Sequence, residues 1–375
     1  MRFRFGRRWL TVGLLLAALL ALVGGACGAD EDNGALATPT SATTAAGTAG
    51  PESSPTPTAD PQAAIRERLK GVPGIVDPSN LGWPRRVTGL NGERTIQQKP
   101  QRIHTMSAGI DEITLSLVPI ERVVGVGSAT KNPDISFLAP HVQGLPTVAR
   151  EPEAVIRLNP ELVIATPTQR AELVAAIENA GIPVIQLDLD PTPTGRINAI
   201  LLLGYIYGEE ERAVALADEV ASRYDALVAV TGKKPDSSKP VVVSLTKYTS
   251  LYAAGSGTTG DGIILAAGGR NGAAEAGIEG NKQISLETVV AANPDVIIIP
   301  MPSTQGEAFK AELLKEPVLA SVPAIRTGRV YVVPPALYTT NSFANVRAAE
   351  HLAHILWPAE FPVADPPQFR LAGPR

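Results

Sequence analysis

A repeated segment is the feature that most restricts how this chain can fold. Residues 153–164 (EAVIRLNPELVI) and residues 287–298 (ETVVAANPDVII) share Glu, Val, Asn, Pro and Ile at the same spacing. In each copy a short helical stretch meets a proline, which ends a helix, and an apolar run typical of a buried strand follows at once. Two such copies predict two lobes of similar construction.

Apolar runs typical of buried strands alternate with helical patterns along both halves of the chain, which indicates an α/β fold with mainly parallel strands. The predicted strands cover residues 102–106, 123–126, 162–165, 183–187, 240–245, 296–299 and 329–333. The predicted helices cover residues 110–117, 153–158, 169–179, 196–205, 261–267, 286–292, 305–315 and 341–356. In addition, Asn91-Gly92 between two strand-like runs predicts a hairpin. We expect two Rossmann-like α/β lobes with a ligand cleft between them.

A long helix is predicted between the two lobes, over residues 209–231. Its apolar residues recur at helical spacing, three glutamates begin it at Glu209, and Lys233 and Lys234 follow it, so both ends match the helix dipole. About 22 residues give a rod of roughly 33 Å. We expect a rigid interlobe connector; the alternative is an ordinary crossover helix within one large sheet.

The N-terminus has the pattern of an export signal. Four arginines and no acid precede the apolar run 9–23, which is shorter than the roughly 20 residues of a spanning helix. The single cysteine, Cys27, cannot form an internal disulfide or a zinc cluster. It follows Val-Gly-Gly-Ala, which resembles a bacterial lipobox and implies lipid attachment at Cys27, on the outer face of the cytoplasmic membrane. The alternative is a stable N-terminal membrane anchor with an incidental cysteine.

Charge and composition divide the rest of the chain. Removing four of 33 Lys and Arg leaves 29 against 37 acids, a net charge of −8, which argues against binding nucleic acid through bulk charge. The Ala/Thr/Ser/Pro-rich stretch has too few large apolar residues to fold. The predicted parts are a signal peptide (1–26), a disordered tether (27–64), a poorly defined lead-in (65–84), an N-terminal lobe (85–208), the interlobe helix (209–231), a C-terminal lobe (238–358) and a tail (359–375).

From about residue 87 to residue 358 the sequence resembles the iron-siderophore, heme and cobalamin class of ABC-transporter substrate-binding proteins. The resemblance implies a ligand held between two lobes of a monomer, no resident cofactor, and delivery to an ABC permease and its ATPase. It also implies that Glu153 and Glu287, one per lobe, dock on the permease. Besides the repeat, it rests on segments 99–103 (KPQRI), 121–126 (ERVVGV), 257–271 (GTTGDGIILAAGGRN) and 328–331 (GRVY).

Candidate ligand-binding residues lie in loops at the carboxyl ends of predicted strands, where open α/β sheets bind ligands. They are Arg150, Tyr248, Tyr252, Tyr338 and Asn341. A guanidinium suits carboxylate or hydroxamate oxygens, and tyrosine offers a flat amphipathic surface or a ligand for ferric heme. Each of these side chains also has a simpler interpretation, as a surface arginine or a packing tyrosine.

The ligand expected from this pattern is a metal chelate, with a ferric siderophore first and heme or cobalamin next. Residues 255–260 match G-x-G-x-x-G, but no ribose-binding acid or P-loop lysine accompanies them. Four histidines are too sparse for a direct metal site, and no motif of a hydrolase is present. We therefore expect no catalytic residues and no enzyme. The alternative is an extracytoplasmic enzyme or redox carrier on the same two-lobe scaffold, because a fold alone does not fix function.

Overall fold

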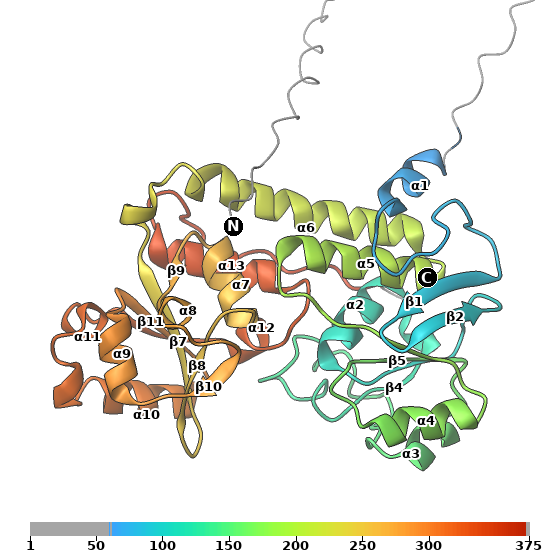
Figure 1. Ribbon diagram of the computed structural model, residues 1–375, viewed down its shortest axis with the longest axis horizontal. Coiled ribbons are helices and arrows are strands. Elements are labelled where there is room, and N and C mark those ends of the chain that lie inside the picture. The colour runs from blue at the N-terminus through green and yellow to red at the C-terminus, as the bar shows by residue number, and fades with distance from the viewer. Residues whose placement is uncertain (1–59, 61, 373–375) are drawn as a thin grey trace, which may run out of the picture. The chain divides into compact units, whose positions relative to one another are not determined.

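The computed structural model describes residues 60 and 62–372, which form one compact unit with two lobes (Figure 1). The predicted signal peptide (1–26), Cys27 and most of the predicted tether lie outside the described residues. Within the described part, no helix is long and apolar enough to cross a membrane.

The N-terminal lobe contains a four-stranded parallel sheet in the order β4-β3-β5-β6. All four strands were predicted, because each is a short apolar run. The hairpin predicted from Asn91-Gly92 is present as β1 and β2, with the turn at Leu90-Asn91 and Gly92 as the first residue of β2. The elements are α1 (Ala63–Leu69), β1 (Arg85–Gly89), β2 (Gly92–Ile96), β3 (Ile103–Thr105), α2 (Ala108–Leu117), η1 (Ile120–Arg122), β4 (Val123–Gly125), α3 (Pro152–Arg157), β5 (Leu162–Ala165), α4 (Ala171–Asn179) and β6 (Val184–Gln186).

The C-terminal lobe contains a six-stranded sheet in the order β10-β8-β7-β11-β12, with β9 paired to β7. This sheet is mixed, because β8 and β10 pair antiparallel, so the expectation of mainly parallel pairing is wrong at this edge. Its elements are β7 (Val241–Lys247), β8 (Leu251–Ala254), α7 (Thr259–Ala266), β9 (Arg270–Asn271), α8 (Gly272–Glu275), β10 (Asn281–Gln283), α9 (Leu286–Ala292), β11 (Val296–Pro300), α10 (Ser303–Leu313), η3 (Pro317–Leu319), α11 (Pro323–Arg326), β12 (Val330–Val333), α12 (Pro335–Tyr338) and α13 (Asn345–Leu356).

The sequence repeat corresponds to a structural repeat. Helix α3 leads into β5, and α9 leads into β11, and each of these strands lies inside its sheet. Asn159 and Asn293, at matching places, have φ of 47° and 44°, and they are the non-glycine residues with positive φ in the described part. Asparagine tolerates this left-handed conformation better than most residues. The repeat therefore preserves a backbone turn, and the prediction of two similar lobes is confirmed.

Two helices connect the lobes, α5 (Pro193–Tyr207) and α6 (Glu210–Thr231). Gly208, with φ of 68°, ends α5 in the left-handed conformation that favours glycine. Helix α6 follows after Glu209 and runs along the top of Figure 1 between the two sheets. The η2 turn (Asp236–Ser238) then leads into β7.

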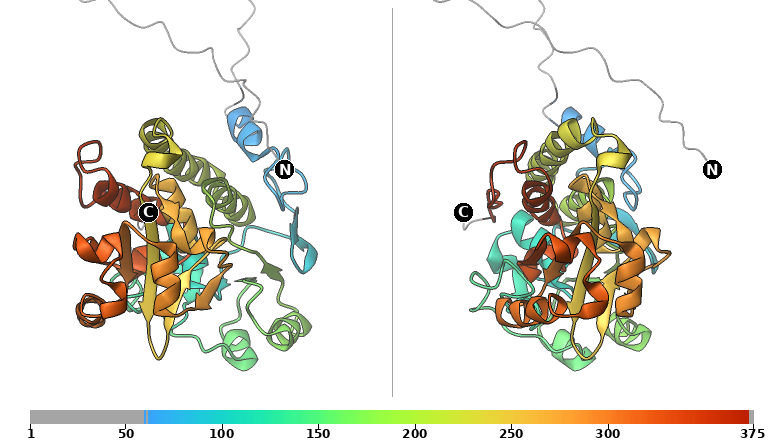
Figure 2. Two further views of the ribbon diagram at one scale, coloured as in Figure 1. Left: turned by 60° about the vertical axis from the view of Figure 1, so that its left-hand side comes forward. Right: turned by 90° about the vertical axis from the view of Figure 1, so that its left-hand side faces the viewer.

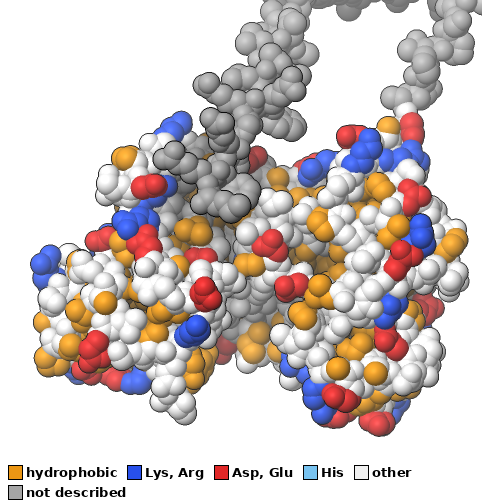
Figure 3. All heavy atoms as spheres, in the orientation of Figure 1, with side chains coloured by type: hydrophobic (Ala, Val, Ile, Leu, Met, Phe, Trp, Pro, Cys, Tyr) orange, Lys and Arg blue, Asp and Glu red, His pale blue; other side chains and the backbone are white. Residues whose placement is uncertain are grey.

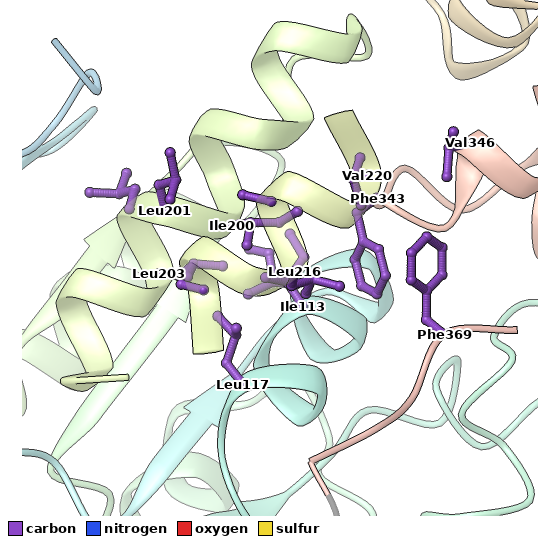
Figure 4. Packing of buried hydrophobic residues seen from close by; sticks show 14 of the residues in the cluster. Ile113, Leu117, Ile200, Leu201, Leu203, Leu216, Val220, Phe343, Val346 and Phe369 are labelled. Atoms are coloured by element: carbon purple, nitrogen blue, oxygen red, sulfur yellow. The ribbon is translucent and has the colours of Figure 1, made fainter. Parts of the chain in front are cut away.

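One apolar core passes from lobe to lobe. It includes buried residues of α2, α5 and α6 together with residues of the C-terminal lobe, among them Phe343 and Val346 (Figure 4). Two smaller clusters, around Val163 and around Ile299, cover the other faces of the two sheets. Because the lobes share close-packed apolar contacts, they are not independent domains.

Candidate functional site

Three predicted tyrosines line one cavity of about 400 Å³ on the C-terminal lobe. Tyr248 lies in the turn between β7 and β8 and is 72% exposed, whereas Tyr252 in β8 is half-buried. Tyr338, at the end of α12, is buried. The other residues that line the cavity are Ser244, Thr246, Thr249, Ala254, Thr258, Thr259, Gly260, Asn281, Pro300 and Thr339. The wall of this cavity therefore has aromatic rings, hydroxyls and one amide, and no charged side chain.

The hydroxyl of Tyr338 forms a hydrogen bond within the protein. It lies 2.7 Å from Nδ1 of His351, and the two rings meet edge to face with centroids 5.9 Å apart. Burial raises the pKa of Tyr338 well above its ordinary value, because the phenolate would lose its hydration. Tyr338 therefore offers the cavity a ring surface rather than an anionic oxygen, and Tyr248 and Tyr252 remain the accessible phenols.

The G-x-G-x-x-G stretch forms the entry to α7 beside this cavity. Thr258 caps the helix, since its side chain accepts from the Asp261 amide at 3.1 Å. Asp261 accepts in turn from the Gly257 amide at 3.0 Å and from Asn271 Nδ2 at 2.9 Å. The protein's own oxygens thus occupy the amides of Gly257 and Asp261, so these two amides are not available to a ligand.

A second cavity, of about 410 Å³, opens in the N-terminal lobe around the ends of β3 and β4. Arg150 lies exposed at its edge, while Asp111 and His104 lie buried among its walls. Asp111 accepts hydrogen bonds from the hydroxyls of Thr105 and Thr130, and burial raises its pKa to about 7. Nδ1 of His104 donates to the Gly125 carbonyl at 3.0 Å, and burial lowers the pKa of this imidazole. Arg150 is therefore the accessible charge of this cavity.

A third cavity, of about 400 Å³, is lined from both lobes. Pro133 and Asp134 come from the N-terminal lobe, and Met301, Glu307 and Pro335 come from the C-terminal lobe. The surface is hollowed between the two lobes at the lower edge of Figure 3. The predicted cleft between lobes is thus present, and it carries two carboxylates at this point.

Asn341, the remaining predicted ligand contact, joins the lobes instead of lining any of these three cavities. Its Nδ2 donates to the Leu189 carbonyl, and its Oδ1 accepts from Arg196 Nη1 at 2.8 Å. Both polar groups of the amide are therefore occupied by the protein.

Sequence reasoning missed the buried acids of α2. Glu112 accepts from Ser136 at 2.7 Å and from Ser342, which comes from the segment between α12 and α13. Burial raises the pKa of Glu112 to about 8. The sequence did contain a signal for these acids, the Asp-Glu pair inside the otherwise mostly apolar run 108–117. Acids in such a run are expected to be buried, and buried acids are rare unless they have a partner.

The two predicted docking residues lie at matching places. Glu153 is in the first turn of α3 and Glu287 is in the first turn of α9, and both are exposed. Neither forms a salt bridge within the part of the chain that the structure describes. A hydrogen bond from Ser285 lowers the pKa of Glu287, so this carboxylate is ionised at neutral pH.

Residues 106–337 match the family of periplasmic binding proteins, and the chain belongs to this family. It is thus a substrate-binding protein of an ABC importer and not an enzyme.

Named relatives span most of the folded part. The Bacillus subtilis protein YvrC, an uncharacterised ABC transporter substrate-binding lipoprotein, is 26% identical over 72% of this chain and 84% of its own length. A cobalamin-binding protein of Halobacterium salinarum is 29% identical over 64% of each chain. Among solved structures, the apo form of the periplasmic heme-binding protein RhuT from Roseiflexus sp. RS-1 is 28% identical, with a TM-score of 0.60 over 69% of this chain and 99% of its own.

Proposed function

We propose that this protein captures an uncharged metal chelate, with cobalamin as the first candidate, and delivers it to an ABC permease. The observation that carries this proposal is the charge of the three cavities. The C-terminal-lobe cavity has no charged side chain, the interlobe cavity has Asp134 and Glu307, and Arg150 is the one Lys or Arg that lines any of the three.

A ligand that loses its water shell needs partners of matching chemistry. Cyanocobalamin carries no net charge and presents primary amides, which both donate and accept hydrogen bonds. Hydroxyls such as those of Thr246 and Tyr252 can both accept hydrogen bonds from these amides and donate hydrogen bonds to them. The tyrosine rings can cover the apolar faces of a corrin. The name of the Halobacterium relative agrees with this ligand.

Anionic chelates fit the same lining less well. The propionates of heme and the oxygens of catecholate siderophores are best held by arginine or lysine, and Arg150 alone supplies that here. Two observations favour heme. One is the name of the RhuT relative, a heme-binding protein. The other is the pair of accessible phenols of Tyr248 and Tyr252, since tyrosine can ligate heme iron. Among siderophores, a ferric trihydroxamate is the second candidate, because it lacks negative charge and Arg150 can contact its oxygens.

Delivery uses Glu153 and Glu287 in this proposal. Two exposed carboxylates at repeated positions, one per lobe, can meet two basic sites on a symmetric permease. The protein acts as a monomer outside the cytoplasmic membrane, held there by lipid on Cys27, and the permease works with its ATPase. Arg150, Tyr248, Tyr252 and Tyr338 are the proposed ligand contacts.

A thermal-shift panel tests the ligand class. Cyanocobalamin, ferrioxamine, ferric enterobactin and hemin are each added in excess to the purified protein. We expect the largest rise in Tm with cyanocobalamin, because a ligand that binds only the folded state stabilises it by mass action. A rise with hemin or ferric enterobactin alone would overturn the proposed ligand class, and no rise with any of the four would remove metal chelates from consideration.

A further inference from the structure

The C-terminal tail, residues 357–372, runs alongside α6. It contains no helix or strand beyond a turn at its start, and four of its residues are prolines. In both views of Figure 2 it lies on the face away from the hairpin β1–β2. The tail lies beyond the residues that match the family, 106–337.

The start of the tail is fixed to the C-terminal lobe. Trp357 Nε1 donates to the Ala267 carbonyl, just after α7, at 3.1 Å. Glu360 forms a salt bridge with Lys234, which follows the end of α6. Lys234 Nζ also lies 4.9 Å from the centre of the Trp357 ring.

The middle of the tail is fixed to the middle of α6. Arg223 donates to the Pro367 carbonyl at 3.1 Å, and its guanidinium carbon lies 4.4 Å from the centre of the Phe369 ring. Phe369 is only 8% exposed and meets Phe343 edge to face, with centroids 4.7 Å apart (Figure 4). Both rings belong to the core that the two lobes share.

The end of the tail is fixed to the N-terminal lobe. The Ala372 amide donates to the Leu115 carbonyl of α2 at 3.1 Å. Two residues further along α2, the Leu117 carbonyl accepts from Arg212, in the first turns of α6, at 2.9 Å. The tail thus starts on one lobe, follows α6, and ends on the other lobe.

The tail is long enough to follow α6 from end to end. Helix α6 has 22 residues and is roughly 33 Å long. The residues from Glu360 to Ala372 can reach at most about 40 Å when fully extended. Prolines 362, 366 and 367 restrict the backbone freedom of this span. A chain that is anchored at both ends, with Phe369 buried in the core between them, opposes bending of the helix beside it.

We infer that the C-terminal tail is a brace, a second interlobe connection that stiffens α6 and limits how far the lobes open. Helix α6 alone could bend or twist as the lobes pivot. With the brace in place, such a motion has to pull Phe369 from the core or break the contacts at the ends of the tail. The brace therefore narrows the range of lobe separations. If a chelate contacts Arg150 on one lobe and the tyrosines on the other, as in the proposed function, the brace also slows its release.

Distances between two spin labels test the brace without any ligand. In the full chain Cys27 is replaced by serine, and Glu172→Cys in the N-terminal lobe and Lys315→Cys in the C-terminal lobe provide the labelling sites; both positions are exposed. Pulsed electron–electron double resonance then gives the distribution of interlobe distances. We compare the parent chain with Phe369→Ala, with Ala372→Pro, which removes the amide donor to Leu115, and with Val363→Ala as the matched control, since Val363 is 59% exposed on the same tail.

The brace predicts a clearly broader distribution for Phe369→Ala, a smaller broadening for Ala372→Pro and no change for Val363→Ala. If Phe369→Ala does not fold, Ala372→Pro decides by itself. A lower Tm with an unchanged distribution would overturn the inference, because the tail would then stabilise the fold without limiting lobe motion. Stopped-flow release of cyanocobalamin should also become about tenfold faster in Phe369→Ala. If the parent chain does not bind cyanocobalamin, the proposed function is contradicted. The distribution of interlobe distances still tests the brace in that case, because its measurement needs no ligand.

Discussion

Arg196 Nη1 donates a 2.8 Å hydrogen bond to Oδ1 of Asn341 and so joins α5 to the segment between α12 and α13. The same guanidinium nitrogen also donates to the Ser342 carbonyl, and Asn341 Nδ2 donates to Leu189. The sequence placed Asn341 in a ligand-binding loop. In the structure its amide links the two lobes.

Replacing Asn341 should therefore weaken the fold. Asn341→Leu leaves the Leu189 carbonyl without this donor and leaves the Ser342 carbonyl as the remaining acceptor of Arg196 Nη1, at a cost of about 1–3 kcal/mol in the free energy of unfolding. Urea denaturation measures this change. Asn281→Leu, at an exposed residue of the C-terminal-lobe cavity, is the control and should leave the unfolding free energy nearly unchanged. Weaker ligand binding by Asn341→Leu at full stability would instead make Asn341 a ligand contact.

Stability should fall with rising pH because of Glu112. Its pKa is raised from 4.5 to about 8 in the folded protein. Between these values the folded state holds a proton that the unfolded state has lost, so unfolding releases protons and the free energy of unfolding decreases as pH rises. Glu112→Gln resembles the protonated acid and removes this dependence. Denaturation at pH 5, 7 and 8.5 should show that the free energy of unfolding of the variant, relative to that of the parent, increases at each step. If the unfolding free energies of the two proteins changed in parallel with pH, the raised pKa of Glu112 would be contradicted.

The accessible tyrosines should determine affinity without determining stability. Tyr248→Ala and Tyr252→Ala each remove a ring from the wall of the C-terminal-lobe cavity, and each should weaken chelate binding roughly tenfold, the usual value of an aromatic contact. Fluorescence titration measures the change. Leu90→Ala is the control, because Leu90 is 63% exposed on the remote β1–β2 turn. Equal affinities in all four proteins would remove this cavity from the binding site.

Charge reversal at the repeated glutamates should separate delivery from capture. Glu153→Lys with Glu287→Lys places two cations where the permease is expected to present cations, so uptake of labelled ligand by cells should be lost while the Kd stays the same. Glu172→Lys with Glu279→Lys, two exposed acids elsewhere on the same lobes, should transport normally. Normal uptake by the Glu153/Glu287 variant would refute the docking role.

Much of the fold followed from local pattern. Strands β3, β5, β7, β11 and β12 could be predicted because they are short apolar runs that are buried or half-buried along their length. Strands β8 and β10 were missed because their sequences, LYAA and NKQ, have little apolar alternation. Helix α13 begins at Asn345 and not at residue 341, because Thr340, Asn341 and Ser342 bond to the N-terminal lobe.

The site was less visible in the sequence. Tyr248, Tyr252 and Tyr338 could be placed near one another because all three were predicted in loops after strands of one lobe, although Tyr252 lies in β8 and Tyr338 ends α12. That the Tyr338 hydroxyl would be taken by His351 depends on α13 packing beside α12, which local patterns do not reveal. The lead-in was described as poorly defined, yet α1 packs against α6 through an ion pair between Arg68 and Asp218. Contacts between residues far apart in the sequence decide such features, and no local pattern encodes them.

Isothermal titration against ligands of graded charge tests the central claim, that cavity walls with a single basic side chain, Arg150, select a chelate without negative charge. Cyanocobalamin, a cobalamin derivative with one amide hydrolysed to a carboxylate, and hemin are titrated into the purified protein at pH 7. The account predicts one-to-one binding that is tightest for cyanocobalamin and weakens as negative charge is added, because no second basic side chain lines the three described cavities. Tight binding of hemin with no binding of cyanocobalamin would contradict it.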